Sequence, residues 1–281
     1  MKKGLLFKKQ YVIINLFLTK FSLTRFKMFI KKAEKAFLKS YDSSAFEKLS
    51  VTTDLLVFSI SDLKTNNYRK LSEKVMSVFL ANRDQFPFKD CWSLPGGFVS
   101  PEETLEETAK RVLREKIHLD DLYLEQLYTF GGVERDPRMR IISVAYMALV
   151  ERSDLPYSLQ QSDHWFNICR EENKFILRNE NNSSIEVDLN TPSALAFDHH
   201  EIIKVGLERL KNKIEYTDLA FHLVPNEFTL TELQNVYEAV LGKKLLAPAF
   251  RRTIKSKVHE TGNMTSGSGH RPSALFKYKA D

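Results

Sequence analysis

The chain has 281 residues, of which 43% are hydrophobic and 28% are charged, as in globular proteins and unlike disordered or fibrous ones. At roughly 100–200 residues per domain, this length suits two domains. No apolar run reaches the roughly 18 residues that a membrane-spanning helix needs. The two cysteines, Cys91 and Cys169, are too few for a disulfide framework. We therefore expect a cytoplasmic protein without a membrane partner.

The charges are distributed unevenly along the chain. Residues 1–40 contain 11 Lys and Arg residues and one acidic residue, Glu34. Residues 41–242 contain 22 basic and 33 acidic side chains, whereas residues 243–281 contain nine basic ones against Glu260 and Asp281. An acidic body that ends in a basic segment predicts that the C-terminal end contacts a polyanion. A solvated basic tail is the alternative.

The N-terminal segment, residues 1–35, is interpreted as a basic extension, for which disorder is one option. It lacks the long apolar centre and the small-residue cleavage site of a signal peptide. A peripheral amphipathic helix is a weaker alternative. Because Met28 offers a second start, we interpret residues 1–27 as an upstream segment that the folded protein does not need.

Hydrophobic patterning and turn-forming residues predict alternating strands and helices after residue 50. The helix after the loop at Pro95–Gly97 is expected to begin with a capping box from Ser100 to Glu103, with Pro101 at its first position. The other expected elements are strands at 51–60, 74–80, 122–130 and 140–150, a polar hairpin at 171–190 with its tip at 179–184, and an amphipathic helix at 199–213 that bridges two domains.

Residues 96–119, GGFVSPEETLEETAKRVLREKIHL, resemble the Nudix box, which runs Gly, five residues, Glu, seven residues, then Arg-Glu-apolar-any-Glu-Glu-any-Gly-apolar. The residues at matching positions are Gly97, Glu103, Arg111, Leu113, Glu115 and Leu119. Three positions depart from the pattern: Val112 and Lys116 replace glutamates, and His118 replaces the glycine. The fixed spacing of the matches indicates the Nudix fold.

The box combines two tasks, and only one of them is retained here. Glycines let backbone N–H groups approach a diphosphate, and Glu103 and Arg111 can pair to fix the loop. Positions 112, 115 and 116 are spaced to share a helical face, on which family hydrolases collect Mg²⁺ with three carboxylates. With Val112 and Lys116 there, we expect no catalytic residue and no metal. The alternative is a diverged hydrolase that uses Glu102, Glu106 or Glu107 as substitute ligands.

A turn at residues 131–138 contains Arg135 and Arg138, and an arginine can bind a phosphate with two parallel hydrogen bonds. A solvated hairpin tip is the alternative. The residues expected to bind a phosphorylated effector are Gly96, Gly97, Phe98, Glu103, Arg111, Glu115, Arg135 and Arg138.

The C-terminal segment shows the order of a winged helix-turn-helix domain. A capping box, Thr229 to Glu232, starts a helix that Gly242 ends, and a basic helix follows from Ala247 or Pro248 to Val258. A Gly- and Ser-rich stretch at 261–270 and a strand at 274–278 would form the wing. The residues expected to contact DNA are Arg251, Arg252, Lys255, Lys257 and Arg271. A helical dimerisation cap is the alternative.

Over residues 30–280 the chain resembles the NrtR family of Nudix-related transcriptional regulators. The stretches that carry the resemblance include PFKDCWSLPGGF, RDPRMR, LAFDHHEII and AFRRTIKSKVHETG. The family often has Gly-Arg-Pro in the wing, where this chain has His270-Arg271-Pro272. The resemblance implies an α/β fold, namely a Nudix-like α/β/α sandwich with a mixed sheet followed by a winged helix-turn-helix domain. We place the effector-binding domain at 36–197, a linker helix at 198–222 and the DNA-binding domain at 223–281.

The same resemblance implies a homodimeric regulator, in our interpretation a repressor, of genes for NAD metabolism or sugar use. Double-stranded operator DNA would be its partner, and ADP-ribose or a related phosphorylated sugar its effector. No cofactor is required, and Mg²⁺ is needed only if hydrolysis survives. The alternative function is an ADP-ribose pyrophosphatase with an accessory nucleic-acid-binding module, and a third is an RNA-binding Nudix relative.

Overall fold

A computed structural model describes residues 28–63, 73–119, 122–171, 174–265 and 272–279. The chain divides into two units, one up to Lys48 and one from Leu49 onwards. In the first unit, residues 28–40 form a helix with exposed side chains, and η1 spans Ser43–Ala45. This helix runs across the boundary expected between the extension and the domain at residue 36. The upstream segment, residues 1–27, lies outside the described residues.

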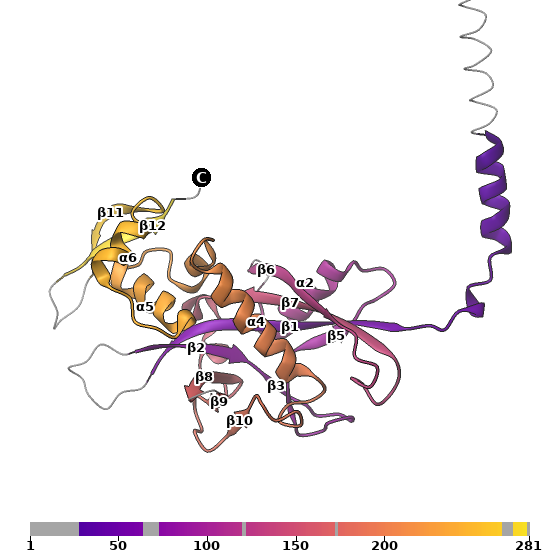
Figure 1. The fold of residues 1–281 in the computed structure, drawn as a ribbon, viewed down its shortest axis with the longest axis horizontal. Helices are drawn as coiled ribbons and strands as arrows, with labels where there is room; N and C mark the ends of the chain where they lie inside the picture. The colour runs from indigo at the N-terminus through magenta and orange to yellow at the C-terminus, as the bar shows by residue number, and fades with distance from the viewer. Residues whose placement is uncertain (1–27, 64–72, 120–121, 172–173, 266–271, 280–281) are drawn as a thin grey trace, which may run out of the picture. The chain divides into compact units, whose positions relative to one another are not determined.

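The second unit is built on a mixed sheet whose main path runs β10-β9-β8-β2-β1-β7-β6, with β5 paired to β1 (Figure 1). The central strands β1 and β7 are parallel, and the other pairs are antiparallel. The strands are β1 Ser50–Asp62, β2 Lys74–Phe79, β5 Gly96–Phe98, β6 Tyr123–Phe130, β7 Ile141–Leu149, β8 Trp165–Glu171, β9 Lys174–Asn179 and β10 Glu186–Asp188; β3 Ala81–Asn82 and β4 Trp92–Ser93 pair separately. The predicted strands and the polar hairpin are thereby confirmed.

Helices cover both faces of this sheet. Leu55 and Val57 of β1 belong to the core under α2, Leu105–Ile117, whereas Leu56 and Phe58 belong to the core under α4, His199–Lys213. Helix α4 packs closely on β1 at Gly206, which has no side chain. A Cβ atom at this position would lie 2.0 Å from Leu56 Cδ2, which is too close for a larger residue. The short elements η2, Arg152–Asp154, and α3, Tyr157–Gln160, lie between β7 and β8. The arrangement confirms the predicted α/β/α sandwich with a mixed sheet.

Helix α2 begins four residues later than predicted. Its N-cap is Thr104, whose side chain accepts from the Glu107 N–H while Glu107 accepts from the Thr104 N–H. Ser100 and Glu103 instead form a turn, in which the Glu103 N–H donates to the Ser100 carbonyl at 3.0 Å. The sequence contains two capping-box patterns in succession, and the second one is used.

The C-terminal elements are η3 Leu219–Leu223, α5 Leu230–Leu241, α6 Ala247–Ile254, β11 Val258–Met264 and β12 Ala274–Tyr278. Gly242 ends α5 with a φ of 66°, as the left-handed C-cap position favours. Phe228 pairs with Phe276 and so adds to the wing sheet. The second helix was predicted to continue to Val258, but Val258 begins β11. No helix in the described ranges is long and apolar enough to cross a membrane.

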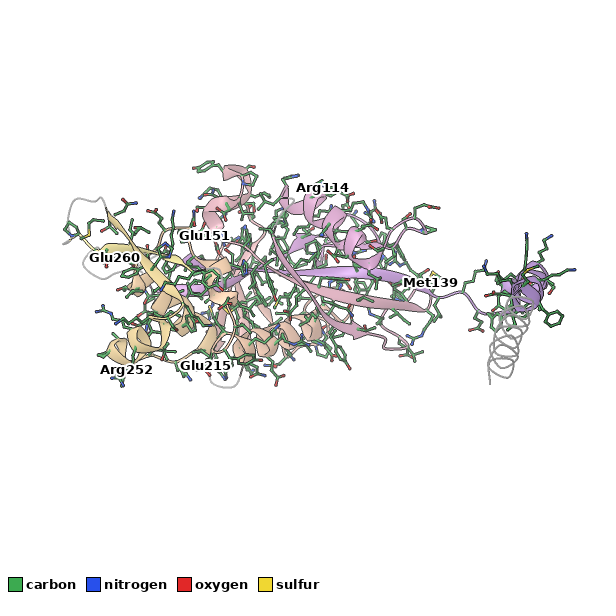
Figure 2. All side chains as sticks on the ribbon, turned by 90° about the horizontal axis from the view of Figure 1, so that it is seen from above. Arg114, Met139, Glu151, Glu215, Arg252 and Glu260 are labelled. Carbon is green, nitrogen blue, oxygen red and sulfur yellow. The ribbon has the colours of Figure 1, made fainter. Side chains whose placement is uncertain are left out.

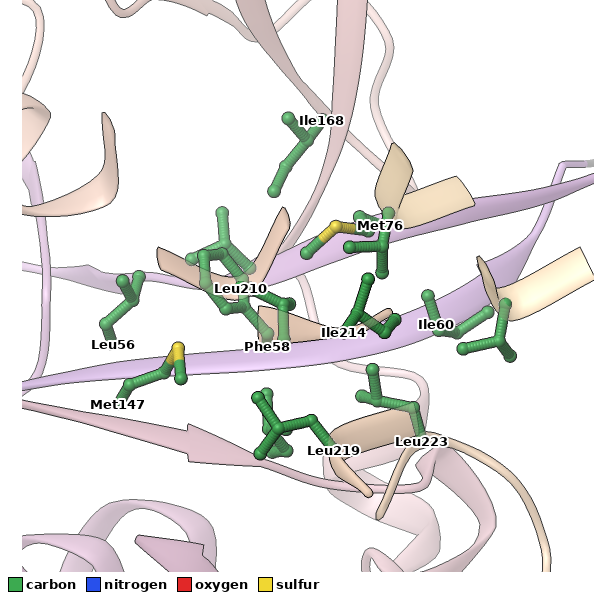
Figure 3. Close-up of a cluster of buried hydrophobic side chains, with 14 of the residues drawn as sticks. Leu56, Phe58, Ile60, Met76, Met147, Ile168, Leu210, Ile214, Leu219 and Leu223 are labelled. Atoms are coloured by element: carbon green, nitrogen blue, oxygen red, sulfur yellow. The ribbon is translucent and has the colours of Figure 1, made fainter. Parts of the chain in front are cut away.

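The core under α4 continues without interruption into the winged helix domain. Leu210 and Ile214 from the end of α4 belong to the same buried cluster as Leu219 and Leu223 of η3 and Phe58 of the sheet (Figure 3). The same cluster reaches the buried side chains of α5 and α6. The two domains therefore share buried apolar surface, which couples their positions more tightly than a free linker would.

Candidate functional site

A pocket of about 150 Å³ opens where β1, β5, the turn after β6 and the residues before α4 meet. Its lining comprises Thr52, Asp54, Arg83, Leu94, Gly96, Gly97, Phe98, Arg135, Asp136, Arg138, Phe197 and His199. The structure thus brings together five of the predicted effector residues: Gly96, Gly97, Phe98, Arg135 and Arg138. The other three, Glu103, Arg111 and Glu115, do not line it.

Arg135 forms a buried ionic network at the base of this pocket. Its guanidinium donates to both carboxylate oxygens of Asp198, at 2.9 and 2.6 Å, and to Asp54 Oδ2 at 3.2 Å. Ser143 donates a further hydrogen bond to Asp54 Oδ2 at 2.6 Å. Burial opposes the charged form of Arg135, but the two carboxylates outweigh it and raise its pKa. Arg135 is therefore a fixed positive charge and not a solvated hairpin tip.

His199 is the neutral member of the same network. Its Nδ1 accepts a hydrogen bond from the Leu94 N–H at 2.9 Å, so the neutral ring carries its proton on Nε2, which lies 3.6 Å from Asp54 Oδ1. Burial lowers the pKa of His199 despite the nearby carboxylates. This contact joins the first turn of α4 to the loop before β5.

Two further arginines and two aromatic rings form the rim of the pocket. Arg138 is held by Asp136 through hydrogen bonds of 3.0 and 2.7 Å. Arg83 donates to the Pro87 carbonyl and, within the described residues, makes no ion pair with a carboxylate. Burial and the charge of Arg138 lower the pKa of Arg83. Two cations in such proximity, with one unneutralised, favour an anionic ligand.

The rim aromatics lie against these cations. The Arg83 guanidinium carbon lies 4.8 Å from the centroid of the Phe197 ring, and that of Arg138 lies 5.6 Å from the Phe98 ring. Phe98 is also half exposed. Aromatic rings next to unburied cations suit a ligand that combines phosphates with a planar base.

The loop-fixing part of the Nudix box is assembled as predicted. Arg111 donates to both carboxylate oxygens of Glu103, at 2.7 and 3.0 Å, and to the Phe98 carbonyl at 3.1 Å. Thr108 donates to Glu103 Oε2 at 3.0 Å. The bonds from Arg111 are the main reason that the pKa of Glu103 falls to about 2. Glu103 and Arg111 therefore position the pocket loop from outside.

The metal-binding part of the box has a different composition and a different geometry. Val112 is buried in the core and packs against the pocket loop, so closely that a Cβ atom added to Gly97 would lie 3.1 Å from Val112 Cγ2. Glu115 and Lys116 are exposed. The three positions lie on one helix at the predicted spacing, but Val112 packs towards the sheet while the other two face solvent. Glu115 lies 3.5 Å from Arg111, and thus forms an ion pair with it.

Two of the three substitute ligands considered from the sequence, Glu106 and Glu107, are engaged elsewhere, and Glu102 is exposed on the loop before α2. Glu106 pairs with Lys110 at 2.6 Å, and Glu107 caps α2 at Thr104. Within the described ranges, no three His, Cys, Asp or Glu side chains are grouped to hold a metal ion. The residues present do not fit the Mg²⁺ site of Nudix hydrolases, which requires several oxygen ligands around one point.

The winged helix domain exposes Arg251 and Arg252 on α6 and Lys255 immediately after it. Figure 2 shows Arg252 at the outer surface of this domain. Lys257 was expected beside them, but it donates to Asp218 Oδ1 at 2.9 Å and to the Thr217 carbonyl at 3.0 Å. Lys257 thus ties the end of the basic helix to the segment after α4. The predicted wing residue Arg271 lies outside the described residues.

Sequence reasoning missed four residues that line the pocket and one that pairs with Arg135 beside it: Asp54, Arg83, Phe197 and His199, and Asp198. They come from three separate segments, so no local spacing unites them. One signal was available, because Phe197, Asp198 and His199 lie within LAFDHHEII, a stretch that carries the family resemblance.

Fold and site together define a Nudix domain joined to a winged helix domain. Protein-family models agree: residues 69–180 match the NUDIX domain, and residues 220–278 match the NrtR DNA-binding winged helix domain. Over 249 residues, the chain is 35% identical to the ADPR responsive transcriptional repressor NtrR of Acinetobacter baylyi, covering 88% of each protein. The chain belongs to the NrtR family.

Two further relatives are similar to this chain over different lengths. The crystal structure of Shewanella oneidensis NrtR complexed with a 27mer DNA shows 30% identity and a TM-score of 0.61, covering 82% of this chain and 93% of that one. The ADP-ribose pyrophosphatase of Methanocaldococcus jannaschii is 32% identical over 132 residues, which cover 47% of this chain and 66% of that protein.

Proposed function

We propose that this protein is an ADP-ribose-responsive transcriptional repressor whose Nudix domain binds its effector without hydrolysing it. The observation that carries the proposal is the divided Nudix box: the Glu103–Arg111 pair that shapes the loop is intact, whereas Val112 and Lys116 occupy metal-ligand positions. A box retained only for shape suits a binding domain better than a catalytic one.

The effector is ADP-ribose or a related phosphorylated sugar. Arg83 and Arg138 provide donors for phosphate oxygens, and Phe98 and Phe197 provide surfaces for a planar base. A volume of about 150 Å³ encloses only part of such a ligand, so the remainder would lie across the aromatic rim. The Acinetobacter relative, named for its response to ADPR, supports the assignment.

The winged helix domain binds operator DNA through α6, which would enter the major groove, and the wing. The Shewanella relative, solved with DNA, supports this role. A homodimer on a palindromic operator, acting in the cytoplasm where the DNA is found, completes the proposal. We place the regulated genes in NAD metabolism, with sugar-use genes as the alternative.

Titration calorimetry with ADP-ribose tests the effector site. Arg83→Ala should lower the affinity about tenfold or more, because it removes a charge-assisted phosphate contact. Lys116→Ala, which removes an exposed charge outside the pocket, should leave the affinity within twofold. Equal ADP-ribose affinities of the two variants would show that ADP-ribose does not bind in this pocket.

A gel-shift assay over promoters of neighbouring NAD genes tests the DNA-binding role. We expect preference for a promoter fragment over random duplex, and a log affinity that falls with log salt by about 0.9 for each phosphate neutralised. The absence of sequence preference would contradict a regulatory role, and stronger binding to single-stranded RNA would favour an RNA-binding relative.

A hydrolase is the second candidate, because one curated relative is an ADP-ribose pyrophosphatase. Its test is the release of AMP from ADP-ribose with Mg²⁺ or Mn²⁺. We expect no turnover above the uncatalysed rate. Turnover near one per second would establish the enzyme and overturn the interpretation of Val112 and Lys116.

A further inference from the structure

A second cavity lies where the sheet, α4 and α5 meet, and it shares no lining residue with the Nudix pocket. Its volume is about 440 Å³, within the roughly 300–1,000 Å³ range of small-molecule sites. Apolar side chains from all three sides line it, namely Met76, Ile168, Phe175, Leu207 and Val240. The cavity therefore offers a largely apolar surface at the junction of the two domains.

Three cations project into this setting with one acidic residue beside them. Arg170 comes from β8, and Lys204, Glu208 and Lys211 come from successive turns of one face of α4. Among the described residues, none of the three cations has a carboxylate partner within 4.0 Å. Their charge is thus left for a ligand to neutralise.

On the other face of α4, two cations are paired with a carboxylate. Arg209 lies 3.1 Å from Glu125, and Lys213 lies 2.6 Å from the same carboxylate on β6. Glu125 also accepts a hydrogen bond from Tyr123. Because the described part of the sheet supplies a carboxylate for these two cations and none for Lys204 and Lys211, the cavity face of α4 differs in its charge.

Arg170 links the cavity to the winged helix domain. Its guanidinium carbon lies 5.6 Å from the centroid of the Phe175 ring. The guanidinium is also close to Gly242, the residue that ends α5, because a Cβ atom added to Gly242 would lie 3.2 Å from Arg170 Nη1. The C-terminal end of a helix carries partial negative charge and attracts a cation. An anion bound in the cavity would therefore compete with the end of α5 for Arg170.

We propose that this junction cavity binds a small organic phosphate with a planar apolar portion, such as a nucleoside monophosphate. Lys204, Lys211 and Arg170 contact the phosphate, and the apolar lining around Phe175 contacts the planar portion. Because the ligand touches the sheet, α4 and α5, it constitutes a second input to the position of the winged helix domain, separate from the Nudix pocket.

The test is calorimetric titration of the full-length protein with AMP. The titration is made in an Arg83→Ala/Arg138→Ala background, which weakens the Nudix pocket. We expect AMP to bind, inorganic phosphate to compete weakly, and Lys204→Ala/Lys211→Ala to reduce the affinity at least tenfold. The matched control Lys89→Ala/Lys116→Ala removes two exposed lysines outside both cavities and should change the affinity less than twofold. Lys204→Arg/Lys211→Arg, which keeps the charge, should retain binding.

Three outcomes would overturn the proposal: no AMP binding at millimolar concentration, equal loss in the control variant, or retention of full affinity without Lys204 and Lys211. The lysines could instead contact phosphates of the DNA backbone, and a titration with operator DNA in the absence of AMP distinguishes this case. If Lys204→Ala/Lys211→Ala weakened operator binding tenfold, these lysines would serve the DNA backbone and the small-molecule site would be wrong. None of these measurements uses ADP-ribose, so the effector proposal stands or fails separately.

Discussion

The arginines of the Nudix pocket and those of α6 carry the same charge in opposite settings. The Arg135 side chain is 4% exposed and hydrogen-bonded to two carboxylates, whereas Arg251 and Arg252 are exposed and, among the described residues, unpaired. A paired, buried guanidinium has one orientation, which suits a ligand of fixed shape. Exposed cations on flexible stems suit the repeating charge of a nucleic-acid backbone. Positive charge thus fixes the shape of a ligand pocket in the Nudix domain and attracts a polyanion in the winged helix domain.

The largest expected effect comes from breaking the buried side of this comparison. Arg135→Met leaves Asp54 and Asp198 without their cation, and removing one partner of a buried pair costs about 3–5 kcal/mol. Urea unfolding should show this loss in the free energy of unfolding. Arg140→Met removes an arginine whose partners among the described residues are the carbonyls of Gly131 and Gly132, and it should cost distinctly less. Equal losses would mean that the network does not stabilise the pocket.

The exposed side should respond in binding and not in stability. Arg251→Ala/Arg252→Ala should weaken operator binding about 100-fold, because two backbone or base contacts are lost, and leave ADP-ribose affinity and unfolding unchanged. Fluorescence anisotropy with a labelled operator measures the effect. The control Lys89→Ala/Lys116→Ala removes the same charge from the Nudix domain, and a similar loss there would reduce the effect to net charge alone.

A smaller effect is expected at the end of the box helix. His118 is the C-cap of α2 with a φ of 59°, at the position where the Nudix pattern has glycine. A non-glycine residue with a left-handed backbone conformation is strained, and relief of this strain by His118→Gly should stabilise the protein by about 1 kcal/mol. The greater conformational freedom of glycine in the unfolded chain offsets part of this gain. Thermal unfolding measures it, and a lower Tm would show that the His118 side chain contributes favourable contacts.

The smallest effect concerns the pH dependence of the Glu103–Arg111 pair, which is partly exposed to solvent. The pKa of Glu103 falls from 4.5 to about 2 on folding, so its stabilisation is complete above pH 4.5 and is lost as the pH falls towards 2. Glu103→Gln should therefore lower Tm at pH 7, and its difference from the wild type should shrink as the pH falls below 4.5. A constant difference across this range would exclude the carboxylate as the cause.

Much of the fold could be predicted because its signals are local. The apolar, β-branched strand β1 follows from its composition, and the amphipathic helix α4 and the capped helix α5 follow from residue spacing and cap residues. The start of α2 could not be settled locally, since Ser100 and Thr104 each precede a glutamate by three residues. The end of α6 was misplaced because the pairing of Val258 with Tyr278 across the wing overrides the helical pattern.

The site was harder to predict than the fold. Glu103 and Arg111 could be paired from their spacing, since both lie in one motif. The network of Arg135 with Asp54 and Asp198 joins residues 81 and 63 positions apart, which only the folded sheet brings together. The burial of Val112 likewise depends on which face of α2 packs on the sheet.

The most direct test of the account is operator affinity measured as a function of ADP-ribose, with AMP release followed in the same samples containing Mg²⁺. We predict that ADP-ribose changes the operator dissociation constant at least fivefold while remaining intact, since allosteric coupling typically amounts to about 1–3 kcal/mol. An unchanged operator affinity, or a change that follows the appearance of AMP, would contradict an effector domain that binds without cleaving.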